Sequence, residues 1–404
     1  MQKLIVISID SLTDDDIKKA GYTPNISYLI DHGTYIKNIN GIYPSLTHPC
    51  HATIITGQNP GVHEIISNKD YSLPNHPWFN SLSDIKCETV VDVFKRNGAS
   101  IACCRWPVTA GGFEKIDYLI PEITNENDIK NDCLGHYLEI SSPALHGIIK
   151  RHINTLELKK QPEEDLFSTS CVADIIRTYK PDVLFTHPAS VDSFKHKYGV
   201  EAPETFEVIR LVDKMVGDII KAVEDIGMIN QTIFVILSDH GHEKVEREVA
   251  LNEIFIRDGI YGKLIAFECG HSAEIYLNGI SEEEALSYLE SKINDVSSGI
   301  SKVFSKEELV KRYGTFGDFS IMVESDERTM FSNEINTTIC KKSNEASTHG
   351  HMPEKYPKPI FIAKGPGISH KIILEDSMLK EASTFLKIMG IDSVSLGEPL
   401  DIFL

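Results

Sequence analysis

The sequence has 404 residues, of which 41% are hydrophobic and 25% charged, a composition typical of a globular protein. It contains no run of 18 or more apolar residues that could span a bilayer, so we expect no membrane association. The net charge of −19 argues against a nucleic acid duplex as partner, because duplex binding depends on Lys and Arg. A small anionic substrate stays possible, since bound cations can make one pocket positive.

The first residues and the cysteines bear on localisation. Residues 1–10 hold a short apolar run that ends in a carboxylate, without a small-residue cleavage site, which is typical of a buried strand. The eight cysteines are scattered and form no CxxC pair, which favours free thiols in a reducing compartment. We therefore expect a cytoplasmic protein.

Apolar runs of β-favouring residues recur along the chain. Residues 4–9 predict a strand buried on both faces, with Asp10 at its end. Thr23 and Pro24 then open a helix that Gly33 ends. Further strands are predicted at 54–57, 100–104, 183–186, 233–237 and 359–363, with a helix at 205–226. This alternation predicts an α/β fold with a doubly wound, mostly parallel sheet flanked by helices.

Two stretches interrupt the alternation. Residues 118–168 are polar and helix-prone, and we expect a lid-like helical insertion there. Residues 264–330 contain two predicted strands, 272–277 and 319–323, around a helix at 281–292. We therefore predict a small α+β cap insertion at 264–330, within a catalytic domain formed by 1–263 and 331–404.

Acidic, imidazole and hydroxyl side chains occur at or just beyond predicted strand ends, where ligands bind in open α/β sheets. They are Asp10, Thr47, Asp192, His196, Asp239, His240 and His349. Mixed carboxylate and imidazole ligands suit Zn²⁺ and also accept Mn²⁺ or Fe. Singly, each residue has an ordinary explanation such as a helix cap or a turn. Together they predict a metal centre.

Four motifs resemble those of the type I phosphodiesterases and nucleotide pyrophosphatases, within the alkaline phosphatase superfamily. The most specific is Tyr-Pro-Ser-Leu-Thr-His-Pro-Cys-His at 43–51, which places Thr47 at the position of the family's nucleophile. Asn68 falls at the position of its phosphate-binding asparagine. The other three are Asp-x-x-x-His-x-x-Gly from 192, Ser-Asp-His-Gly from 238 and Thr-His-Gly from 348.

The resemblance implies two divalent metal ions, Zn²⁺ in the first place and Mn²⁺ as the alternative. One metal would be held by Asp192, His196 and His349. The other would be held by Asp10, Asp239, His240 and the Thr47 oxygen. Thr47 would then attack phosphorus and form a phosphothreonine intermediate, while Asn68 donates to a substrate oxygen. The implied substrate is a small anionic phosphorus compound with a phosphodiester or pyrophosphate bond.

Some residues depart from the family pattern. His48, Cys50 and Glu64 replace an aromatic residue, an asparagine and a glycine, so the leaving-group pocket need not fit a nucleotide. His242 and His351 follow two metal-ligand motifs; they are either hydrogen-bond partners of the ligands or exposed loop residues, and we favour the second reading.

Other functions stay open. A phosphonoacetate-hydrolase-like enzyme, which cleaves a C–P bond, has a similar threonine segment and grips a carboxylate with lysines; Lys69, Lys195 and Lys197 lie near the motifs. A phosphomonoesterase is another possibility, and a non-catalytic metal-binding module is less favoured. Arg105 and Trp106 follow a predicted strand and could hold an anionic leaving group or stack on a ring, although Trp106 is as compatible with the core.

Overall fold

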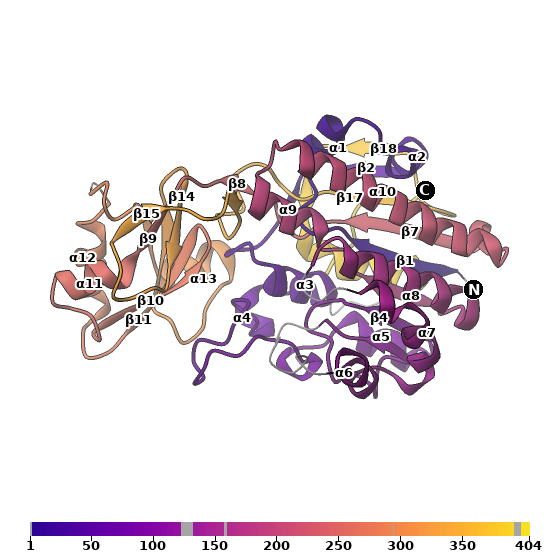
Figure 1. Cartoon of the computed structure of the whole chain (residues 1–404), viewed down its shortest axis with the longest axis horizontal. Helices are drawn as coiled ribbons and strands as arrows, with labels where there is room; N and C mark the ends of the chain where they lie inside the picture. The colour runs from indigo at the N-terminus through magenta and orange to yellow at the C-terminus, as the bar shows by residue number, and fades with distance from the viewer. Residues whose placement is uncertain (1, 123–131, 157–159, 294, 392–396) are drawn as a thin grey trace.

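A computed structural model describes residues 2–122, 132–156, 160–293, 295–391 and 397–404. An α/β body and a smaller lobe lie side by side (Figure 1). In the described residues, the body is built on an eight-stranded sheet of order β18-β2-β17-β7-β1-β6-β4-β5. These strands are β1 Lys3–Ser8, β2 Thr34–Ile36, β4 Ile101–Cys104, β5 Tyr118–Ile120, β6 Val183–Thr186, β7 Thr232–Leu237, β17 Phe361–Lys364 and β18 Lys371–Ile373.

The sheet is mixed but mostly parallel, which confirms the predicted fold class. Only β17 runs against its neighbours β7 and β2, and the other pairs are parallel. Its strands are apolar because helices cover both faces, so successive residues of β1 enter different cores: Leu4 and Val6 one, Ile5 and Ile7 the other.

Each face of the sheet has its own set of helices. The first core includes side chains of α3 Thr47–Thr56, α5 Val90–Arg96 and α14 Glu381–Ile388. The second includes side chains of α1 Asp14–Ala20, α2 Pro24–Asp31, α6 Cys133–Ile140, α7 His146–His152, α8 Glu163–Tyr179 and α10 Pro203–Asp225. The predicted helices that open at Pro24 and at about residue 205 are therefore confirmed as α2 and α10.

The predicted strand at 54–57 is wrong. Residues 54–56 are the end of α3, and Gly57 caps the helix in the left-handed conformation with φ 65°. Thr53, Ile54, Ile55 and Thr56 are all buried. A helix buried on every side shows no amphipathic period, so its β-branched residues resemble a buried strand.

The lobe has its own core. Its antiparallel sheet, in the order β10-β11-β13-β12, consists of β10 Leu264–Cys269, β11 Ser272–Leu277, β12 Ile300–Ser305 and β13 Ile321–Ser325. A second sheet contains β9 Arg247–Ala250, β14 Thr329–Ser332 and β15 Cys340–Lys342, and the helices are α11 Leu251–Arg257, α12 Glu282–Glu290 and α13 Lys306–Tyr313. Val249, Phe255 and Phe331 also belong to the lobe core. The domain boundaries at 264 and 330 stay a prediction.

The predicted insertion at 118–168 is described only in part, because 123–131 and 157–159 lie outside the described residues. The remainder contains β5, α6, α7 and the start of α8. Its role as a lid stays a prediction. In the part of the chain that the structure describes, no helix combines the length and apolar character needed to cross a membrane.

The lobe meets the body at a close backbone contact. The His271 N–H, in the turn between β10 and β11, donates to the His349 carbonyl at 2.9 Å. Gly350 follows with φ 88°, and a Cβ atom there would lie 1.7 Å from the Cys269 carbonyl oxygen. Only glycine fits both the conformation and the contact.

Candidate metal centre and active site

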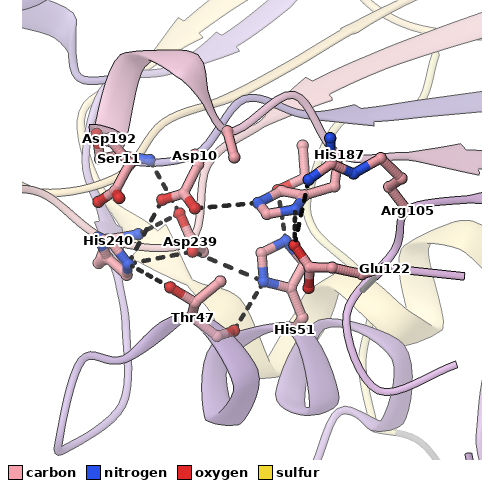
Figure 2. A network of polar contacts seen from close by, with 12 residues as sticks. Asp10, Ser11, Thr47, His51, Arg105, Glu122, His187, Asp192, Asp239 and His240 are labelled. Carbon is pink, nitrogen blue, oxygen red and sulfur yellow. Dashed lines mark hydrogen bonds and ion pairs between the residues drawn. The ribbon is translucent and has the colours of Figure 1, made fainter. Parts of the chain in front are cut away.

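Three adjacent strands bring polar residues to one edge of the sheet. Asp10 follows β1, His187 follows β6 and Asp239 lies just after β7. Because β7, β1 and β6 are parallel neighbours, their carboxyl ends meet there. Figure 2 shows the three side chains converging above Thr47, the first residue of α3.

The first group of potential ligands comprises Asp192, His196, His242 and His349. Asp192 and His196 lie one turn apart on α9 Ser190–Tyr198, with His196 Nε2 3.5 Å from Asp192 Oδ2. His349 follows β16 Ser347–Thr348, which pairs with β8 Glu243–Lys244, and its Nε2 lies 3.8 Å from Asp192 Oδ1. These atoms are close enough to share one cation.

Hydrogen bonds orient two of these imidazoles. His196 Nδ1 donates to Glu345 Oε2 at 2.8 Å, and His349 Nδ1 donates to the Ser45 carbonyl at 3.1 Å. Both rings therefore direct Nε2 toward Asp192. Metal-binding histidines generally donate their second ring nitrogen to such an acceptor.

The second group surrounds His240. Its Nε2 lies 3.2 Å from Asp239 Oδ2, 3.5 Å from Asp10 Oδ1 and 3.2 Å from the Thr47 hydroxyl. Asp239 Oδ1 accepts from the Ser11 and His240 backbone N–H groups. Asp10 Oδ2 accepts from His187 Nε2 at 3.1 Å. Each carboxylate is therefore fixed through one oxygen.

The other oxygen of each carboxylate fits a cation. Asp10 Oδ1 and Asp239 Oδ2 are buried and have no hydrogen-bond partner in the described residues. Burial, then the charges of Asp192 and Asp239, raises the pKa of Asp10, and burial raises the pKa of Asp239 to about 7. A buried carboxylate cluster of this kind calls for compensating positive charge.

The charge on Asp192 is maintained differently. Burial alone would raise its pKa, but the charge of His196 and the hydrogen bond from His242 outweigh burial and hold the pKa well below its usual range. The reciprocal attraction from Asp192 and Glu345 overcomes burial and raises the pKa of His196 to about 9. The two groups thus stabilise each other's charged forms.

Thr47 and Asn68 line one wall of a cavity of about 370 Å³, together with Asp10, Asp192 and His196. Asn68 Oδ1 accepts from the His48 backbone N–H at 3.0 Å, which fixes the carboxamide and leaves its NH₂ group as the donor toward a ligand. The structure therefore brings all the predicted metal and catalytic positions into one site.

The sequence-based reading of His242 and His351 as exposed is wrong, because both are buried. His242 Nε2 lies 2.6 Å from Asp192 Oδ1, within the first group of potential ligands. His351 contacts the ring of His271 instead. Sequence position alone does not distinguish these two environments.

Three further polar residues at the site were not predicted. His51 Nδ1 donates to the Thr47 carbonyl at 2.7 Å, His187 holds Asp10, and Glu122 Oε1 lies 4.0 Å from His187 Nδ1. His51 lies one helical turn after Thr47, and His187 follows a strand, so the strand-end argument could have found His187. Glu122 has no comparable signal.

The three lysines considered for a carboxylate pocket are absent from the lining of this cavity, among the described residues. Lys195 is buried and donates to the Ser11 carbonyl and to Asp16 Oδ2, both at 2.6 Å. Lys69 lies over the Trp78 ring at 5.6 Å, and Lys197 over Tyr198 at 4.8 Å. Lysine recognition of a substrate carboxylate therefore gains no support.

The fold is of the alkaline-phosphatase-like class, with a mixed sheet that carries clustered acidic and imidazole side chains at one edge. Residues 4–352 match the type I phosphodiesterase/nucleotide pyrophosphatase family, and the chain belongs to that family.

Two curated relatives that the chain matches are distant. Mouse ectonucleotide pyrophosphatase/phosphodiesterase family member 1 is 26% identical over 224 residues, which cover 55% of this chain and 22% of the relative. Venom phosphodiesterase 2 of Crotalus adamanteus is 23% identical over 385 residues, which cover 91% and 43%. The chain thus spans less than half the length of these curated relatives.

A solved structure confirms the fold over nearly the whole chain. Murine ectonucleotide pyrophosphatase/phosphodiesterase 5 superposes with a TM-score of 0.72 at 18% identity, covering 97% of this chain and 96% of that one.

Proposed function

We propose that this protein hydrolyses phosphodiester or pyrophosphate bonds, with Thr47 as the nucleophile and two divalent cations, Zn²⁺ in preference to Mn²⁺. One observation carries the proposal: the Thr47 hydroxyl lies 3.2 Å from His240 Nε2, beside buried oxygens of Asp10 and Asp239 that have no hydrogen-bond partner among the described residues. A hydroxyl placed among metal-binding groups is poised for activation as a nucleophile.

We divide the proposed ligands between the two cations as the family resemblance implies. Asp192, His196 and His349 would hold one cation, and Asp10, Asp239, His240 and Thr47 Oγ1 the other. When bound, the cations would lower the pKa of the threonine hydroxyl and neutralise charge on the phosphoryl group.

The chain's own residues then account for the displacement. Thr47 Oγ1 forms a bond to phosphorus while the bond from phosphorus to the leaving oxygen breaks, which gives a phosphothreonine. Water next attacks this phosphorus, and the Thr47 oxygen departs and regains a proton. Asn68 would donate its NH₂ group to a non-bridging oxygen, a contact commonly worth about 10²–10³ in rate.

A related structure supports the assignment of the nucleophile. Murine ectonucleotide pyrophosphatase/phosphodiesterase 5 has been solved as an inactive threonine-to-alanine variant in complex with AMP. We transfer to this chain the use of a threonine and of a phosphate-containing ligand, and leave the nucleotide itself open.

The test compares hydrolysis of bis-p-nitrophenyl phosphate, p-nitrophenyl phosphate and phosphonoacetate by the Zn²⁺- or Mn²⁺-loaded protein. We expect a preference for the diester and a loss of at least about 10³-fold in kcat for Thr47→Ala. The matched control is Thr155→Ala, because Thr155 is exposed. Full activity in Thr47→Ala would refute the mechanism.

The same assay separates the alternatives. Faster turnover of phosphonoacetate would indicate a C–P bond hydrolase, and faster turnover of p-nitrophenyl phosphate a monoesterase. A folded protein that binds zinc but turns over none of the three would be a metal-binding module.

We also propose a cytoplasmic location, supported by eight cysteines that are all unpaired. Fractionation of the source cells with an antibody against the protein tests this, and recovery outside the cytoplasm would refute it.

A further inference from the structure

We propose that Arg105 binds a second anionic group of the substrate, so that the enzyme selects phosphodiesters or pyrophosphates whose substituent ends in a carboxylate or a phosphate. The inference rests on the proposed function and specifies its substrate class. Arg105 lines the same cavity as Thr47 and Asn68, and Figure 2 shows its side chain beside His187 and Glu122, on the side away from His240.

Arg105 is buried with unused donors. It is 4% exposed, and its Nη2 donates to Glu164 Oε2 at 2.9 Å. Its Nε and Nη1 are also buried, yet they find no hydrogen-bond partner among the residues the structure describes. A guanidinium presents its donors as a planar fork that matches the two oxygens of a carboxylate or phosphate. Donors left unpaired in a buried site are costly, so a ligand that supplies oxygens there gains affinity.

The backbone at Arg105 is strained. Its φ is 56°, in the left-handed region that residues other than glycine rarely adopt. Arg105 directly follows β4, and its N–H donates to the Ile120 carbonyl at 2.7 Å. Strain of this kind costs about 1–3 kcal/mol and tends to occur at functional positions.

The guanidinium lies within reach of a short substituent. Its Nη2 is 3.9 Å from Glu122 Oε1, which is 4.0 Å from His187 Nδ1, and His187 in turn contacts Asp10. One carboxyl and one imidazole therefore separate the Arg105 contact from a proposed metal ligand. This arrangement suits a substituent of a few atoms that bridges from the reacting phosphorus to an oxyanion at Arg105.

The neighbouring groups leave Arg105 able to attract an anion. Burial, opposed by Arg105, raises the pKa of Glu122 to about 7, so Glu122 carries a proton for much of the time at neutral pH. His48 is buried and lines the same cavity. Neither His48 nitrogen has a hydrogen-bond partner in the described ranges, and its Nε2 lies 4.0 Å from Glu122 Oε2.

Binding of inert phosphonates tests the proposal without catalysis. The probes are propylphosphonate, 3-phosphonopropionate and ethylene bisphosphonate, titrated calorimetrically into the zinc-loaded protein. We expect at least one of the two probes with a second anion to bind about tenfold or more tightly than propylphosphonate. The affinities of 3-phosphonopropionate and ethylene bisphosphonate, compared with each other, show whether the site prefers a carboxylate or a phosphate. Equal binding of all three would overturn the proposal.

Variants assign the preference to Arg105. Arg105→Gln should abolish the difference between the probes, and Arg105→Lys should keep only part of it. Arg105→Gln removes the positive charge beside the Glu164 carboxylate. The double variant Arg105→Gln/Glu164→Gln removes both charges and so checks the effect of this imbalance. Arg177→Gln is the matched control, since Arg177 near the end of α8 pairs with Asp225 at the end of α10. A preference that survives Arg105→Gln would refute the assignment.

A kinetic arm separates this inference from the proposed function. The substrates are p-nitrophenyl diesters with ethyl, 2-carboxyethyl or 2-phosphoethyl substituents, compared as ratios of kcat/KM. We expect the ratio of anionic to ethyl substrate to fall about tenfold in Arg105→Gln. Absence of turnover alongside Arg105-dependent phosphonate binding would refute the proposed function and keep the anion site. Turnover with a ratio that does not depend on Arg105 would support the proposed function and refute the anion site.

Discussion

Asp192 is held by more side chains than its sequence motif indicates. His196 and His349 face its oxygens, and His242 also lies 2.6 Å from Oδ1. His242 Nδ1 is in turn 3.1 Å from the Ser347 hydroxyl, so the ring is fixed at both nitrogens. A carboxylate restrained in this way keeps the orientation that a cation requires, and His242 acts as a positioning residue.

Replacement of His242 should therefore weaken zinc binding. We expect His242→Ala to lower Zn²⁺ affinity about 10–100-fold, the effect usual for partners of metal ligands, and His242→Gln to restore part of it by donating to Asp192. Competition with a chromogenic chelator measures the affinity. His370→Ala, an exposed histidine, serves as control, and unchanged affinity in His242→Ala would contradict the role.

Sequence reasoning found the proposed ligands, and the structure brings them together, but it did not find the side chains that contact them. Asp10, Asp239 and His240 belong to motifs at strand ends, where the chemistry restricts the residue type. His51 reaches the site from within a helix. His187 comes from a strand end that carries no motif, and Glu122 comes from a loop. Their roles depend on which ring nitrogen faces which oxygen, and that geometry is set by the tertiary structure.

At the scale of elements, the N-terminus of α2 is capped by a side chain of another helix. Thr23 at its N-terminus makes no side-chain capping bond. Asp213 of α10 takes that role, because its Oδ1 accepts from the Ile26 N–H at 2.8 Å and its Oδ2 accepts from Asn25. A buried carboxylate thus joins two helices on one face of the sheet.

Asp213→Ala should destabilise the fold by about 2–4 kcal/mol, since it removes several bonds to a charged acceptor and leaves buried N–H groups unpaired. Asp213→Asn should cost less, because it keeps one acceptor. Urea unfolding gives the free energies, with Asp218→Ala on the exposed face of α10 as the control. A loss equal to that of Asp218→Ala would show that the cap is dispensable.

The order of elements was largely predictable, because apolar strands alternate with helices in the body and the chain supplies recognisable helix starts. β1, β4, β6, β7 and α10 were found in this way. α3 was mistaken in part for a strand because burial on all sides removes its periodicity. The position of β17 between β7 and β2, and its antiparallel direction, depend on long-range pairing that no local pattern encodes.

At the scale of the whole molecule, buried carboxyl groups link stability to pH. Glu274 of β11 lies in the lobe, 2% exposed, and burial raises its pKa to about 8. Tyr276 donates to its Oε2 at 3.0 Å. Since the unfolded pKa is near the ordinary value of 4.5, the folded state binds more protons between pH 4.5 and 8. Folding stability from this group is therefore present at low pH and is lost as the pH rises toward 8.

Glu274→Gln should remove this dependence, because glutamine imitates the protonated carboxyl. We expect the variant to gain roughly 1–3 kcal/mol more stability relative to wild type at pH 8 than at pH 5. Thermal and urea unfolding at both pH values measure this, with Glu283→Gln on the exposed side of α12 as control. An identical pH profile in wild type and Glu274→Gln would show that Glu274 does not titrate as described.

The contact between the β10–β11 turn and residues 349–350 has a consequence for protein engineering. The lobe cannot be exchanged independently of the body, because its turn holds the backbone of His349, a proposed metal ligand. A chimaera that receives the lobe of another family member inherits that member's turn, and with it a new placement of His349. Recombination within this family therefore preserves the centre only when the turn and the glycine that faces it are exchanged together.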